Sequence, residues 1–163
     1  MRARWPRDVR EVLTAAGWRP GRHVAAQVST WLWQVYDLHP GAADRLPVHP
    51  VARRLLDEFG GLTFRRPERV GSGSGGFDVE LWPTSGRVLV DLFAEFGADL
   101  GAPVFPLAVY QDGPSDIVCA ADGRVFLLRM AGKFLVGPNP DQAIVRLVRG
   151  ETFIPVDDRG EPY

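Results

Sequence analysis

Lysine and cysteine are almost absent from this sequence, and it contains no long apolar run. Lys133 is the single lysine among 19 basic residues, and Cys119 is the single cysteine. One cysteine cannot form a disulfide within the chain, and no apolar stretch approaches the roughly 20 residues that a membrane-spanning helix needs. The first ten residues hold four arginines with no apolar run after them, which does not indicate a secretory signal. We therefore expect a cytoplasmic protein without a membrane partner.

Length and composition indicate one globular domain. Of the 163 residues, 45% are hydrophobic and 24% are charged, which is ordinary for a folded domain. The net charge of -1 conceals an uneven distribution, because residues 1–69 carry +5 and residues 70–163 carry -6. This division either orients a charged partner or cancels because the two parts intermix in the fold. The excess of arginine over lysine is typical of a GC-rich bacterial genome and does not indicate binding to nucleic acid.

Three amphipathic helices are predicted in the first third of the chain. In each, apolar residues recur three and four positions apart and form one face. The segments are 9–16, 28–35 and 48–59. Gly17 and the pair Gly60-Gly61 are stop signals after the first and third helices. Ser29 and Thr30 are the candidate caps near the start of the second.

The middle of the chain predicts antiparallel strands. They are expected at 62–64, 77–82, 104–110, 117–121 and 125–128. Alternation within 77–82 points Val79 toward the core and Asp78 and Glu80 toward solvent. Asp122-Gly123 lies between two apolar runs, which is a strong hairpin signal. The strands from 104 onward therefore form a meander.

Two more helices complete the predicted α+β fold. One covers 89–96 and ends at Gly97, and the other follows Asn139, a plausible N-cap. We expect a single domain, with N-terminal helices packed on a mainly antiparallel sheet and a C-terminal helix. Its core spans about residues 7–150, and 151–163 form a polar, frayed tail. A mobile surface loop is expected at 65–76.

The sequence offers no recognisable catalytic apparatus, metal site or cofactor site. His23, His39 and His49 have neither the i, i+4 spacing nor the motif of a zinc site. Cys119 lies within an apolar run, where burial raises a thiol pKa and makes it inert. The glycine-rich segment 71–76 lacks the strand before it and the helix after it that a phosphate-binding loop requires. The arginines near this loop have no interleaved aromatic residue for base stacking; they are Arg65, Arg66 and Arg69.

An acidic surface in the second part of the chain is the candidate partner-binding site. Asp112, Asp116 and Asp122 are expected at neighbouring loop ends of the meander, where they join the outward carboxylates of 77–82. Trp33 and Trp82 are out of phase with the apolar positions of their elements, so each is either an interface anchor or a contact with another part of the core. The candidate partner-binding residues are Asp78, Glu80, Trp82, Asp112, Asp116 and Asp122.

Four segments carry a resemblance to a known family. They are 12–22, which contains Gly-Trp-Arg-Pro-Gly-Arg; 52–64, which closes on Phe-Gly-Gly-Leu; 101–107, which contains Val-Phe-Pro-Leu; and 122–128, Asp-Gly-Arg-Val-Phe-Leu-Leu. In this order they resemble the third family of the SUKH superfamily of bacterial immunity proteins. The resemblance is collinear and covers roughly residues 9–150.

The resemblance implies a cytoplasmic protein that neutralises a co-encoded polymorphic toxin by binding it. Many such toxins attack nucleic acid, and a nucleic-acid-cleaving domain presents a basic face to which carboxylates can dock. Two alternatives remain open on the sequence. One is a regulatory scaffold of the same fold that binds another cellular protein. The other is a small hydrolytic enzyme built on Asp78, Glu80 and a histidine.

Overall fold

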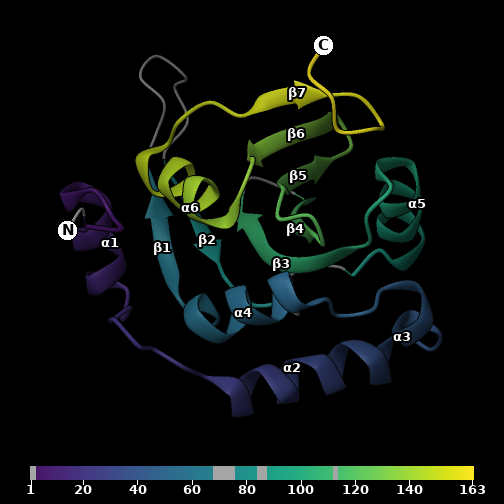
Figure 1. Cartoon of the computed structure of the whole chain (residues 1–163), viewed down its shortest axis with the longest axis horizontal. Helices are drawn as coiled ribbons and strands as arrows, with labels where there is room; N and C mark the ends of the chain where they lie inside the picture. The colour runs from purple at the N-terminus through teal and green to yellow at the C-terminus, as the bar shows by residue number, and fades with distance from the viewer. Residues whose placement is uncertain (1–2, 68–75, 84–87, 112–113) are drawn as a thin grey trace.

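The computed structural model describes residues 3–67, 76–83, 88–111 and 114–163. The helices are α1 (Arg7–Ala15), α2 (Ala25–Leu38), α3 (Ala42–Arg45), α4 (Pro50–Phe59), α5 (Val90–Leu100) and α6 (Pro140–Arg149). The strands are β1 (Thr63–Arg66), β2 (Phe77–Glu80), β3 (Val104–Gln111), β4 (Pro114–Ala120), β5 (Val125–Arg129), β6 (Gly132–Gly137) and β7 (Ile154–Val156). These strands form one antiparallel sheet whose spatial order is the chain order (Figure 1). The predicted α+β class is confirmed.

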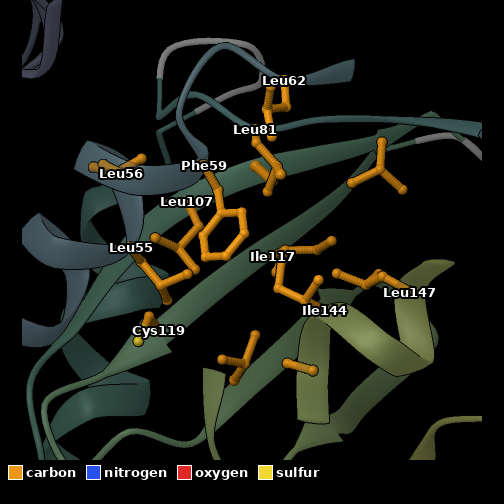
Figure 2. Close-up of a cluster of buried hydrophobic side chains, with 14 of the residues drawn as sticks. Leu55, Leu56, Phe59, Leu62, Leu81, Leu107, Ile117, Cys119, Ile144 and Leu147 are labelled. Carbon is orange, nitrogen blue, oxygen red and sulfur yellow. The ribbon is translucent and has the colours of Figure 1, made fainter. Parts of the chain in front are cut away.

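The larger hydrophobic core lies between the sheet and the helices α1, α4 and α6. Alternation along β4 places Ile117 and Cys119 in this core, where both are fully buried. Phe59 of α4 and Ile144 of α6 meet them from two directions (Figure 2). Burial of side chains of this size stabilises the fold by about 1.5–3 kcal/mol each.

The opposite face of the sheet packs against α5. Val118 of β4 points to this side, between the inward positions Ile117 and Cys119. Phe96 of α5 meets Phe126 of β5 edge to face, with ring centroids 5.1 Å apart. The sheet is therefore covered on both faces, and this accounts for the continuous apolar runs of β4 and β5.

The turn after α1 clamps the end of α4. Trp18 donates from Nε1 to Oε1 of Glu58 at 3.0 Å. Arg22 donates to the carbonyl oxygens of Glu58 and Gly60 at 2.7 and 2.8 Å, and so satisfies carbonyls that the helix end leaves open. A Cβ atom on Gly60 would lie 2.6 Å from Cζ3 of Trp31 in α2, so only glycine fits there. Two of the four resembling segments, 12–22 and 52–64, thus contact each other at the end of α4.

A buried arginine caps the end of α6. Arg66 on β1 donates to the carbonyl oxygens of Arg146 and Leu147 at 2.7 and 3.2 Å, and it also donates to that of Glu151. Its Nε donates to the hydroxyl oxygen of Tyr110 at 3.1 Å. Only 6% of Arg66 is exposed, and this burial is the largest cause of its lowered pKa. The mobile loop expected at 65–76 is therefore wrong at its start, because β1 extends through Arg66.

Two expectations about element boundaries are wrong. Ser29 and Thr30 lie inside α2, which begins at Ala25 without a side-chain cap. Helix α5 continues past Gly97 to Leu100, and Gly101, with a φ of 76°, ends it. Gly97 has a packing role instead, because a Cβ atom there would lie 3.2 Å from the backbone nitrogen of Val104 at the start of β3.

Two strands were not predicted. β6 pairs with β5, and β7 pairs with β6, so the segment after α6 returns to the sheet. Val156 of β7 also forms a bridge with Pro162, so the expected frayed tail is wrong for this segment. Of the glycine-rich segment 71–76, positions 71–75 lie outside the described residues, as does Arg69.

Candidate partner-binding surface

Three of the predicted acidic residues share the α5 face of the sheet. Asp78 and Glu80 flank Val79, which belongs to the opposite core, and Asp116 precedes inward Ile117. Glu80 pairs with Val109, and Val109 pairs with Asp116. Glu80 and Asp116 therefore lie in one cross-strand row, roughly 10 Å apart across β3.

The two β2 carboxylates are partly accessible. The side chain of Asp78 is 47% exposed, and Oδ1 lies 3.9 Å from Nη1 of Arg65, its neighbour on β1. An ion pair at this distance and exposure contributes little stability. The carboxylate of Asp78 is thus available to an approaching charge.

Asp116 differs from these two because it is buried. Only 8% of the residue is exposed, and the described residues give its carboxylate no hydrogen bond or ion pair. Burial raises the pKa of Asp116 from 3.8 to about 6. A side chain in this position cannot make the exposed contact that the sequence predicts for it, although its charge still contributes to the field around the sheet.

Replacing Asp116 with asparagine is expected to stabilise the protein at pH 8. Because the folded-state pKa lies above the unfolded one, this carboxyl favours folding below pH 3.8, and that contribution is lost as the pH rises through 6. After allowance for screening by water, the gain in unfolding free energy at pH 8 is about 1–2 kcal/mol. Urea unfolding at pH 4 and pH 8 measures it, with Asp78→Asn as the half-exposed control. An equal gain at both pH values contradicts the explanation.

Asp122 lies at the other end of β4. Its carboxylate accepts hydrogen bonds from the backbone nitrogen, Nε and Nη2 of Arg124 at 2.8–3.0 Å within the β4–β5 turn. Burial raises its pKa, but the bonds from Arg124 outweigh this and the net pKa is lowered. Asp116 and Asp122 therefore do not occupy neighbouring loop ends, because β4 separates them, and Asp112 lies outside the described residues.

The two out-of-phase tryptophans have different environments. Trp82 is half-buried and packs against the larger core. Trp33 lies on α2 with 66% of its surface exposed. Of the two, Trp33 alone is presented to solvent as an interface anchor would be. The sequence shows that Trp33 is out of phase, but only the fold shows that no other element covers it.

His49 and Cys119 have structural roles. Nδ1 of His49 accepts from the backbone nitrogen of Ala52 at 3.2 Å and caps α4, while Nε2 lies 2.8 Å from the carbonyl oxygen of Cys119. Burial lowers the pKa of His49 and raises that of the Cys119 thiol to about 12. Sequence analysis missed this cap, although a histidine before Pro50 at the start of an apolar pattern was its available signal.

The described part of the chain holds neither a metal-ligand cluster nor a membrane-spanning helix. Within it, no group of three or more His, Cys, Asp or Glu side chains could hold a metal ion. Among the helices described, none is long and apolar enough to cross a membrane.

The fold and surface define an antiparallel α+β domain that is covered by helices on both faces and displays carboxylates and a tryptophan to solvent. The family model described as SUKH-3 immunity protein matches residues 5–150. The chain therefore belongs to the SUKH-3 immunity protein family. Searches of curated proteins and of solved structures returned no match.

Proposed function

We propose that this protein binds a co-encoded toxin domain in the cytoplasm and neutralises it by forming a complex, without catalysing a reaction. The observation that carries this proposal is the family match, which spans most of the fold, from two residues before α1 to the residue after α6. Immunity proteins act by occupying their toxin. The partner is thus a folded protein domain.

The placement of the family-like residues supports a binding role. Trp18, Arg22 and Gly60 hold the end of α4 in place, and Trp18 and Arg22 use their hydrogen bonds to contact Glu58 and the backbone at that helix end. Arg124 and Asp122 fix the β4–β5 turn in the same way. Such residues maintain a scaffold, and the scaffold leaves its exposed side chains free to vary with the partner.

The exposed carboxylates suit a basic partner. A toxin that cleaves nucleic acid needs a positive surface, and negative charge on the immunity protein accelerates its approach. We assign this steering role to Asp78 and Asp122, whose side chains are 47% and 39% exposed. Glu80 lies on the same face of β2 as Asp78, and we include it in the same proposed surface together with the half-buried Trp82, two residues after it.

The direct test is capture of the toxin domain encoded beside the gene by the purified protein. A 1:1 complex, together with loss of toxin activity when both are mixed, establishes the proposed function. If the neighbouring toxin domain is not captured, the regulatory scaffold becomes the better explanation.

Charge reversal at the steering residues is expected to slow association. Asp78→Lys and Asp122→Lys should each reduce the association rate constant roughly three- to tenfold at low salt, and less at high salt. Asp8→Lys is the matched control, because Asp8 lies on α1 in the basic part of the chain and is also paired with an arginine, Arg149. Stopped-flow association measures all three. Equal rates for the three variants contradict the assignment.

A further inference from the structure

The helix α2 differs from the other water-facing helices in its lack of charge. Its 14 residues include one charged residue, Asp37. By contrast, α1 has four among nine residues and α4 has four among ten. A solvent-facing helix normally carries charge on its outer side. In Figure 1, α2 forms the lower margin of the molecule, with α4 between it and the sheet.

The outer face of α2 is a stripe of small residues with one aromatic side chain. Ala26, Thr30, Trp33 and Asp37 follow one another at intervals of four, three and four positions, which places them on one side of the helix. All four are exposed, whereas the inward residues of α2 are buried. The hydroxyl of Thr30 donates to the carbonyl oxygen of Ala26 at 3.3 Å, so it is bonded within the helix.

Among the described residues, two carboxylates without a partner lie near the C-terminal end of α2. Asp37 belongs to the last turn of α2, and Asp44 belongs to α3, which packs against α2. Both are exposed, and the described residues give neither one an ion pair or a hydrogen bond. The end of α2 already carries partial negative charge and has no basic residue in its last turn. The nearby Arg45 is paired with Asp91 of α5. This end of the stripe is therefore complementary to a cationic group.

We propose that the outer face of α2, defined by Ala26, Thr30, Trp33 and Asp37, is the surface on which the toxin domain docks. This inference rests on the proposed function. Trp33 enters an apolar pocket of the toxin, the small residues allow close approach, and Asp37 with Asp44 receives a lysine or arginine beside that pocket. Exposed tryptophan and depleted charge are the features that distinguish the centre of a protein interface from other surface. At about 21 Å, the helix is long enough to form much of one side of a standard interface.

The test compares Trp33→Ala with Met130→Ala. Met130 is 97% exposed in the turn between β5 and β6, so it controls for loss of a large exposed apolar side chain. We expect Trp33→Ala to weaken binding to the toxin domain at least tenfold, through faster dissociation, and Met130→Ala to leave it unchanged. Thermal unfolding checks that both variants fold like the wild type. A double variant, Asp37→Lys with Asp44→Lys, should weaken binding and reduce its dependence on salt.

Each outcome decides the proposal. If the wild type binds the toxin domain and both alanine variants bind it with the same affinity, the α2 surface is overturned and the proposed function stands. Wild type that does not bind overturns the proposed function and this inference with it. A wild-type dimer in light scattering that Trp33→Ala converts to a monomer overturns the proposal as well, because it identifies the occupant of the face as a second copy.

Discussion

Replacing Gly60 with alanine is expected to lower the free energy of unfolding by about 3 kcal/mol, because the added methyl group has no space. A Cβ atom at this position would lie 2.3 Å from the carbonyl oxygen of Leu56 and 2.6 Å from Cζ3 of Trp31. The first contact is with the backbone of α4 and the second is with a buried ring. Neither group can move away without a large cost in free energy. Urea unfolding followed by circular dichroism measures the change.

Gly101→Ala is the matched control for this prediction. Gly101 ends α5 with a positive φ, but a Cβ atom there has no neighbour within 4 Å. Its replacement therefore costs only the conformational term, about 1 kcal/mol. If the two alanine variants are equally stable, the close approach of Trp31 in α2 to Gly60 does not require glycine at this position.

Replacing Arg66 with methionine is expected to cost about 3–4 kcal/mol, because it leaves several buried acceptors without a donor. The guanidinium donates to three backbone carbonyl oxygens at the end of α6 and to the hydroxyl of Tyr110. Methionine retains the apolar stem but supplies no donor. Lysine is expected to restore only part of the loss, since one ammonium group cannot reproduce the planar fork.

Arg65→Met provides the internal control for Arg66. The two residues are adjacent on β1 and point to opposite faces of the sheet, and the side chain of Arg65 is 65% exposed. Its removal should change stability by less than about 0.5 kcal/mol. Hydrogen exchange of α6 adds a second readout, because Arg66→Met should release protection in the last turn of that helix specifically. Equal effects at the two positions would contradict the capping role.

The amphipathic helices were the most predictable part of the fold. In α4 and α6 the apolar period, the proline at the first position and the glycine after the last turn agree with one another. The Asp122-Gly123 hairpin was likewise confirmed, with Gly123 at a φ of 96°. Local signals suffice at these positions because the neighbouring residues alone determine the conformation.

Features that depend on tertiary contacts were not predictable from local sequence. Gly97 has the appearance of a helix stop, yet it lies inside α5. A glycine fits there because the start of β3 approaches the helix closely. β7 has three residues and β6 begins and ends with glycine, and each is stabilised by the strand beside it rather than by its own pattern. The charge of Arg66 suggested a solvated loop, whereas the end of α6 provides it with buried acceptors.

The candidate surface was only partly accessible to sequence reasoning. Alternation correctly separated Asp78 and Glu80 from Val79, because the two sides of a strand differ by one residue. Asp116 is buried by tertiary packing around β4, which the strand pattern does not contain. Trp33 could be recognised as out of phase, but its exposure depends on which helices pack around α2.

Titration of the toxin domain with this protein tests the central claim most directly. Toxin activity is measured as the immunity protein is added in substoichiometric and then equimolar amounts. The molecular mass of the complex in solution is measured in parallel. Binding without catalysis predicts that inhibition grows in proportion to the protein added, is complete near one equivalent and coincides with a 1:1 complex. Complete and lasting inhibition by a small fraction of one equivalent would contradict it, because a single molecule would then have inactivated many toxin molecules.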